Sequence, residues 1–289
     1  MLKILISVSI SIIFMTGLQA KTIVFLHGGP GLNSEPERNI LGPYLKDLGH
    51  EALFWNEPSD QRPETFVHEH SFQQAVKSAD KFIHNICQDK QSRGLSCDLT
   101  LVAHSFASHY AVRLAQSQKD VIKEIILISP ALNIKDTDTN ILQLAVNGLK
   151  DEGQFEASDE LAQIVPLLDE AFDSKKVQAF SIGSKYAGLF LNYWSNLELM
   201  QRYFSYMVGE FSFDVKGMFE VRGSMPIVNV NPSSKIDIPT YVYFGEIDPV
   251  TKVKEQMPLL NKYFSAIDVS TLSGVRHYPH LEAMEKINY

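Results

Sequence analysis

Short apolar runs alternate with amphipathic segments along the first part of the chain. Runs rich in β-branched and large apolar side chains predict buried strands at 21–26, 52–55, 99–103 and 124–129. Helical patterns stand between them, from about Pro43 to Gly49, at 69–87, and from Tyr110 onward. This alternation of strand and helix is typical of an α/β protein with a mostly parallel sheet.

The alternation stops between residues 133 and 237. This stretch shows no clear strand pattern but several helical ones, at 141–149, 160–172 and 186–206, and strand patterns return at 239–245 and 266–272. The sequence therefore predicts a core made of 21–132 and 238–289, with a helical cap, 133–237, inserted between two core strands. The cap aromatics could line an apolar substrate pocket, or they could only pack the cap.

The first twenty residues differ in kind from the rest. A short positive start at Lys3 is followed by the almost wholly apolar stretch Ile4–Leu18 and by Ala20, a small residue suited to cleavage. This layout predicts a signal peptide over residues 1–20 and an exported protein, periplasmic or secreted, with no stable membrane association after cleavage. The alternative is an uncleaved anchor helix, although so short an apolar stretch rarely spans a bilayer.

Composition and charge exclude several classes of protein. The 289 residues are 45% hydrophobic and 21% charged, which is ordinary for a soluble globular protein and excludes a disordered or fibrous one. There are 26 basic and 34 acidic residues, giving a net charge of −8, and no long basic run. Nucleic acid is therefore not an expected partner.

Two cysteines, Cys87 and Cys97, are separated by a polar, glycine-containing segment. An exported chain meets an oxidising compartment, and such a segment can fold back on itself, so we predict a disulfide between them. The alternative is two unpaired thiols. Because the chain has no other cysteine, a zinc site is not expected, and no other metal site is indicated.

Ser105 stands where an apolar strand pattern changes to a helical one. Ala103 and Ala107 flank it at two residues on either side, and a strained strand-to-helix turn needs such small neighbours. This is the nucleophile-elbow pattern G-x-S-x-G with both glycines replaced by alanine. Taken alone, the pattern would equally describe a buried serine that caps a helix.

A glycine-rich turn, His27-Gly28-Gly29-Pro30-Gly31, follows the first predicted strand. Glycines let backbone N–H groups approach a ligand closely. Together with the elbow, the turn predicts an oxyanion hole made by the N–H groups of Gly29 and Phe106. The alternative is a plain turn.

Two late blocks supply an acid and a base. Asp248 follows a predicted strand in the turn Gly-x-x-Asp, and His277 stands in the block RHYPHLE. His277 could take the proton of Ser105 while Asp248 orients the imidazole. His280 competes with His277 for the role of base, and Asp237 and Asp268 are alternatives to Asp248.

Four motifs, HGGPG, the elbow, GEIDPV and RHYPHLE, occur in this order over residues 23–282. Together they resemble the α/β-hydrolase superfamily, most closely its proline iminopeptidase-like and esterase-like serine hydrolases. The resemblance implies a mostly parallel, doubly wound sheet of about six strands with a helical cap. It also implies a Ser105–His277–Asp248 catalytic triad, a small acyl substrate and no cofactor. Where proline iminopeptidases usually carry Gly and Trp beside the serine, this chain has His104 and Phe106.

The bond that is cleaved is a separate question. An aminopeptidase must pair the ammonium of its substrate with carboxylates, and residues 180–213 contain only Glu198 and Glu210 as acids. An esterase needs little more than apolar walls, so we expect a carboxylic ester or related acyl bond as the substrate. The alternatives are an aminopeptidase of the proline iminopeptidase type and a catalytically silent binding protein.

Overall fold

Six parallel strands form the centre of the part of the chain that the structure describes. The structure is a computed structural model and describes residues 20–59, 70–169, 171–226 and 235–289. The strand order is β2-β1-β3-β4-β5-β6, and every neighbouring pair is parallel, which confirms the predicted fold class. The strands are β1 (Thr22–Leu26), β2 (Glu51–Trp55), β3 (Leu99–His104), β4 (Ile122–Ile128), β5 (Thr240–Gly245) and β6 (Ile267–Leu272).

The register of the strands brings their carboxyl ends to one edge of the sheet. Leu26 pairs with Ala103, His104 with Ile128, and Gly245 with Leu272. The residues that follow β1, β3 and β5 therefore meet at the same edge, where parallel α/β sheets place their ligand sites. The central strand β3 is buried along its whole length, as its apolar sequence predicts.

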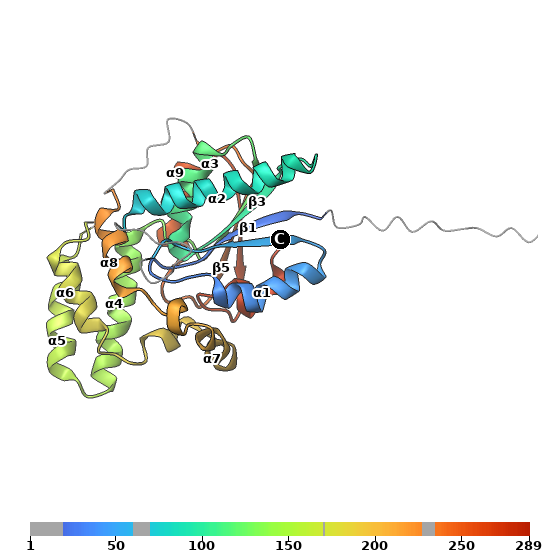
Figure 1. The fold of residues 1–289 in the computed structure, drawn as a ribbon. Helices are drawn as coiled ribbons and strands as arrows, with labels where there is room; N and C mark the ends of the chain where they lie inside the picture. The colour runs from blue at the N-terminus through green and yellow to red at the C-terminus, as the bar shows by residue number, and fades with distance from the viewer. Residues whose placement is uncertain (1–19, 60–69, 170, 227–234) are drawn as a thin grey trace, which may run out of the picture.

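Helices cover both faces of the sheet (Figure 1). On one face, α2, α3 and α9 share a hydrophobic core with the strands, and on the other face α1 and α10 do so. These helices are α1 (Glu35–Asp47), α2 (Phe72–Ser92), α3 (Ser108–Ser117), α9 (Val253–Tyr263) and α10 (Pro279–Glu282).

The first helix begins earlier than its sequence pattern predicts. The expected start near Pro43 is wrong, because Pro43 lies inside α1 and the helix begins at Glu35. Pro36 occupies the first turn, where its missing N–H costs nothing, and the acids Glu35 and Glu37 favour a helix N-terminus.

The stretch between β4 and β5 is helical and carries a hydrophobic cluster of its own. Its helices are α4 (Ile134–Asp151), α5 (Phe155–Ile164), α6 (Ser174–Gly183), α7 (Leu197–Ser205) and α8 (Val215–Ser224), with short 3-10 helices between them. In Figure 1, α4, α5, α6 and α8 lie together at the left, beside the sheet, and α7 lies apart from them, near α1.

The single helix expected at 186–206 is wrong. A 3-10 helix, Leu189–Tyr193, is separated from α7 by the extended residue Trp194. The Asn196 side chain accepts a hydrogen bond from the Leu199 N–H and so starts α7 as a separate helix.

Cys87 at the end of α2 and Cys97 before β3 form a disulfide, with their Cα atoms 5.1 Å apart. The predicted signal segment lies, apart from Ala20, outside the described residues. Among the helices that the structure describes, none is both long enough and apolar enough to cross a membrane.

Candidate active site

Ser105 lies directly after β3, at the turn into a helix. Its φ of 52° falls in the left-handed region, which costs a non-glycine residue on the order of 1–3 kcal/mol and persists only where the surroundings enforce it. A 3-10 turn, Ser105–Ala107, then leads directly into α3. Ala103 and Ala107 are fully buried on either side, so the small neighbours that the sequence indicated are needed by the packing.

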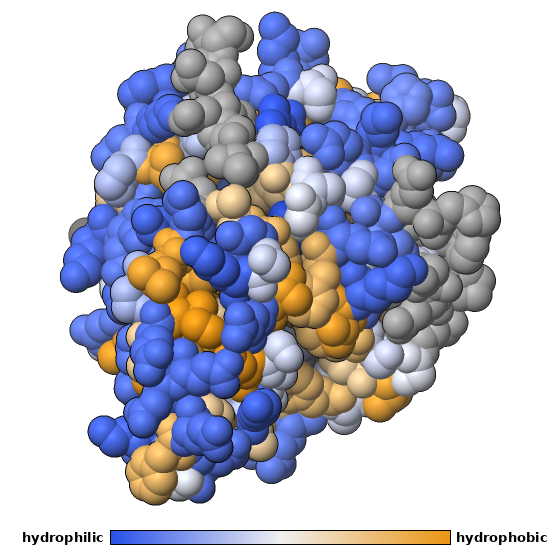
Figure 2. Space-filling model, turned by 90° about the vertical axis from the view of Figure 1, so that its left-hand side faces the viewer, coloured by the Kyte–Doolittle hydropathy of each residue, from blue (hydrophilic) through white to orange (hydrophobic). Residues whose placement is uncertain are grey.

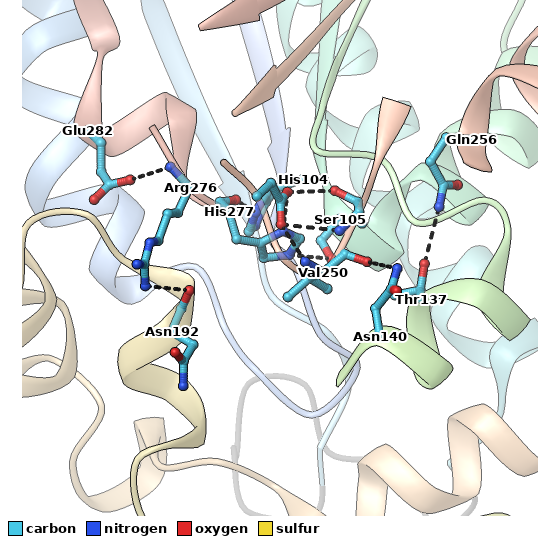
Figure 3. A network of polar contacts seen from close by, with 12 residues as sticks. His104, Ser105, Thr137, Asn140, Asn192, Val250, Gln256, Arg276, His277 and Glu282 are labelled. Carbon is cyan, nitrogen blue, oxygen red and sulfur yellow. Dashed lines mark hydrogen bonds and ion pairs between the residues drawn. The ribbon is translucent and has the colours of Figure 1, made fainter. Parts of the chain in front are cut away.

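Ser105, His277 and Asp248 form a hydrogen-bonded row. His277 Nε2 lies 3.0 Å from Ser105 Oγ, and His277 Nδ1 lies 2.9 Å from Asp248 Oδ2. Figure 3 shows His277 reaching Ser105 from a different part of the chain. All three side chains are buried. An imidazole held between a hydroxyl and a carboxylate in this way can accept the hydroxyl proton.

The sequence alternatives for base and acid lie elsewhere. His280 Nε2 is 3.6 Å from Glu37 Oε1 in a buried pair on the other side of His104. Asp237 accepts a hydrogen bond from Ser265, and Asp268 is on the edge strand β6.

Asp248 is fixed by the turn that follows it. Its Oδ1 accepts hydrogen bonds from the N–H groups of Val250 (2.8 Å) and Thr251 (3.1 Å), and its Oδ2 accepts one from the Thr251 hydroxyl (2.7 Å). Burial by itself raises the pKa of Asp248, but His277 and these hydrogen bonds hold the pKa below its ordinary value. The carboxylate is therefore ionised at neutral pH. The sequence analysis missed Thr251, although an Asp followed three residues later by Thr is a local pattern that could have revealed it.

The HGGPG turn is oriented by His27. The Glu57 N–H donates to His27 Nε2 (3.0 Å), so the ring proton is on Nδ1, which donates to the Gly28 carbonyl (2.5 Å). In a trans peptide the C=O and the next N–H point in opposite directions, so the Gly29 N–H is turned away from His27. Glu57 also accepts hydrogen bonds from the Gly31 N–H (3.0 Å) and from the Tyr110 hydroxyl (2.8 Å). The roles of His27 and Glu57 were not found from sequence.

The two predicted oxyanion donors face a shared space. Gly29 and Phe106 both line the cavity into which Ser105 opens. The Phe106 N–H lies in the first turn of a helix, where such groups have no partner within the helix. The turn comes so close that a Cβ at Gly28 would lie 2.7 Å from His104 Nδ1, which explains the glycine.

Comparisons with known proteins identify the fold. A family model described as serine aminopeptidase, S33, matches residues 56–157. An esterase from Exiguobacterium antarcticum superposes with a TM-score of 0.58 at 11% identity, over 92% of this chain and 88% of that chain. The chain has the α/β-hydrolase fold. A proline iminopeptidase from Mycobacterium smegmatis (TM-score 0.52, 17% identity, 92% and 86% covered) and an epoxide hydrolase from Bacillus megaterium (0.55, 17%, 93% and 90%) are also similar.

The predicted resemblance to the α/β-hydrolase superfamily is thus confirmed. The family model matches residues 56–157, and these structures, at 11% to 17% identity, show the fold. The similar structures are an esterase, a proline iminopeptidase and an epoxide hydrolase, and their sequence identity to this chain is low. They therefore do not identify the substrate. No curated protein matches the sequence.

Within this α/β-hydrolase fold, the loop that carries His277 is tied to the helical insertion. The His277 N–H donates to the Tyr193 carbonyl (3.0 Å). Glu282 accepts hydrogen bonds from the N–H groups of Arg276 (3.2 Å), Ser195 (2.5 Å) and Asn196 (2.7 Å). Figure 3 shows Arg276 lying between Glu282 and Asn192. The end of the RHYPHLE block therefore fastens the loop that carries His277 to the segment before α7.

A second buried polar cluster lies beneath the row. His104 Nε2 donates to the His277 carbonyl (2.9 Å), and one ligand atom each of Glu37, His104 and His280 lies within 4.8 Å of the others. Burial lowers the pKa of both His104 and His280, so both rings are neutral at neutral pH. Two imidazoles and a carboxylate are also ligand types for a divalent metal, so these are the described residues that could hold one. Their clearest contact with the row is the hydrogen bond that supports the His277 backbone.

A cavity of about 470 Å³ is lined by Ser105, by His277 and by residues of the helical insertion. Its wall is mostly apolar and includes seven aromatic residues of the predicted cap, namely Phe172, Phe180, Tyr186, Phe190, Tyr193, Phe213 and Phe219. Other cap aromatics pack instead, and Trp194 stacks on Tyr278 with ring centroids 4.0 Å apart. Figure 2, which views the molecule from the side of the insertion, shows apolar surface gathered across the middle of this face. The volume of the cavity suits a small organic ligand.

Proposed function

We propose that this protein is a serine hydrolase that cleaves a carboxylic ester or related acyl bond through an acyl-enzyme on Ser105. The observation that supports it most directly is the buried hydrogen-bonded row from Asp248 through His277 to Ser105, whose hydroxyl opens into an apolar cavity. The elbow geometry at Ser105 and the hydrolase neighbours support the same assignment.

The proposed reaction proceeds in two halves, acylation and deacylation. His277 Nε2 takes the proton of Ser105 as Oγ attacks the carbonyl carbon, and the resulting oxyanion is bound by the N–H groups of Gly29 and Phe106. His277 then gives the proton to the leaving alcohol. A water molecule, deprotonated by His277, attacks the acyl-enzyme and releases the carboxylic acid, and His277 returns the proton to Ser105 Oγ as the leaving group. Asp248 remains ionised and stabilises the imidazolium in both halves of the reaction.

The cavity favours esters over the amino-terminal peptides of an aminopeptidase. Asp138 is the acidic residue on the cavity wall among the described residues, and its Oδ2 accepts from both Lys176 (2.8 Å) and Arg222 (2.6 Å). A substrate ammonium would therefore be a third cation at an occupied carboxylate, in a site where an unpaired charge is costly. An ester brings no such charge.

Active-site labelling tests the nucleophile. The purified protein should be labelled by a fluorophosphonate probe, and Ser105→Ala should abolish labelling. Ser117→Ala, a matched change at the far end of α3, should label like the wild type. Absence of labelling in the wild type, or equal labelling of Ser105→Ala, would refute the proposal.

Paired substrates test the bond. The value of kcat/KM should be higher for p-nitrophenyl butyrate than for proline p-nitroanilide. A preference for the anilide would instead assign the site to an aminopeptidase.

A further inference from the structure

The apolar cavity has one charged corner. Asp138 on α4 and Arg222 on α8 both line the cavity, and the Arg222 guanidinium donates to Asp138 Oδ2 at 2.6 Å. Lys176 on α6 donates to the same oxygen at 2.8 Å. The side chains of all three residues are at least nine-tenths buried. Three helices of the insertion thus bring two cations to one carboxylate oxygen beside the proposed substrate site.

The Arg222 guanidinium retains hydrogen-bonding capacity at this corner. A guanidinium has five N–H donors, and among the described residues Arg222 has, besides Asp138, the Met225 sulfur at 3.6 Å, which is a weak acceptor. Its planar group lies 5.7 Å from the Phe106 ring and 5.1 Å from the Phe172 ring, and these rings hold it at the cavity wall. Phe106 is also the residue that follows the nucleophile, so Arg222 stands close to the reacting centre.

We propose that Arg222 forms a subsite for a carboxylate carried by the ester substrate. This inference rests on the proposed function, since it names the class of ester that the same site accepts. A planar carboxylate matches the guanidinium fork and gains charge-assisted hydrogen bonds in a poorly solvated pocket. A substrate ammonium would meet Arg222 as a like charge, and a purely aliphatic ester would leave its remaining donors without an acceptor. The carboxylate can be on the acyl or the alcohol side of the ester, and the two sides are distinguishable.

The competing view is that Asp138, Lys176 and Arg222 only fasten α4, α6 and α8 together. Removing one partner of a buried ion pair commonly destabilises a protein, so loss of activity in a variant does not separate the two views. A ratio between two substrates of nearly equal size does, because unfolding reduces turnover of both equally.

The experiment uses matched anionic and neutral esters with the full-length wild type. On the acyl side, monomethyl and dimethyl esters of the straight-chain dicarboxylic acids from succinate to sebacate are compared by quantifying released methanol. On the alcohol side, 4-acetoxybutanoate is compared with its methyl ester by released acetate. For at least one matched pair of esters, of one chain length on the acyl side or on the alcohol side, kcat/KM for the anionic ester should exceed that for the neutral ester at least tenfold.

Variants assign the preference to Arg222. In Arg222→Gln the ratio should fall at least tenfold, mainly through KM of the anionic ester, and Arg222→Lys should restore part of it. Lys216→Gln removes one positive charge from the exposed side of the same helix and should leave the ratio unchanged.

The outcomes separate the two proposals. Cleavage of the neutral esters with a ratio near or below one at every length and on both sides overturns the carboxylate subsite and leaves the serine hydrolase standing. A high ratio that Arg222→Gln leaves unchanged also overturns it, as does failure to cleave any member by protein that the fluorophosphonate probe labels. Failure of the probe to label Ser105 refutes the proposed function itself.

Discussion

His109 should make the protein sensitive to mild acid. This histidine lies on α3, buried beside the Phe106 ring, and its Nε2 donates to the Ala131 carbonyl at 2.9 Å. Burial, and then the positive charge of Arg222, lower its pKa from 6.5 to about 3. The ring is therefore neutral in the folded protein across the whole mildly acidic range, whereas in the unfolded chain it takes up a proton below pH 6.5.

The sign and size of the effect follow from these two pKa values. A histidine whose pKa is lowered by folding contributes its full share of stability above pH 6.5, and that share is lost progressively as the pH falls towards the folded value of about 3. At pH 4.5 the pH is about two units below the unfolded pKa, so His109 alone lowers the free energy of unfolding by roughly 2–3 kcal/mol. His109→Gln keeps an N–H donor for the Ala131 carbonyl and removes the titrating group.

Urea unfolding of the wild type and His109→Gln at pH 7.5 and at pH 4.5 measures this contribution. From pH 7.5 to pH 4.5 the free energy of unfolding of the wild type should fall by roughly 2–3 kcal/mol more than that of His109→Gln. This difference does not depend on how the stabilities of the two proteins compare at pH 7.5. His104 and His280 add to the loss in both proteins and cancel in the comparison. His84→Gln, an exposed change on α2, should behave like the wild type. Equal losses in the wild type and His109→Gln would refute the reasoning.

Three further perturbations test other parts of the molecule. His27→Ala removes the donor that orients the Gly28 carbonyl, so steady-state kcat on a p-nitrophenyl ester should fall about 10²–10³-fold with a small change in KM, and an unchanged kcat would show that the turn holds its shape without the histidine. Asp248→Asn leaves His277 without its ionised partner, so kcat should fall by about 10³–10⁴-fold, and stopped-assay kinetics showing less than a tenfold loss would exclude Asp248 from the proposed triad. Changing both Cys87 and Cys97 to serine opens a short loop, and urea unfolding should show a loss of about 2–3 kcal/mol that reduction of the wild type reproduces. Stability unaffected by either treatment would contradict this.

The parts of the site that the sequence predicts depend on local chemistry. Ser105 is recognisable because a strand, small neighbours and a helix follow one another within a few residues. Asp248 likewise follows β5 at a turn with its own glycine, and the aromatic-Pro pair marks His277. Parallel strands then bring these loops to one edge by register alone, so ordered motifs were sufficient to place them together.

The parts that could not be predicted depend on contacts between segments that are far apart in the sequence. Arg222 and Asp138 are 84 residues apart, and their pairing depends on where the fold places α4 and α8, which neither helix encodes alone. Glu57 meets Tyr110 over a separation of 53 residues in the same way. The aromatic pattern at 186–206 indicated one helix, but Trp194 leaves the helical conformation and stacks on Tyr278. Tertiary contact here overrides local propensity.

The strand order has a consequence for the chain as it is being synthesised. The ribosome completes β1 to β4 and the turn that carries Ser105 long before it reaches β5 and β6, which join the sheet last at one edge. The proposed base arrives 172 residues after the proposed nucleophile, and it is held by a loop that must also meet Tyr193 of the insertion. A translation product that ends between Ser105 and His277 therefore has the serine hydroxyl but lacks the proposed base. Under the proposed mechanism, hydrolytic activity begins only with a nearly finished polypeptide, and prematurely terminated chains are chemically silent.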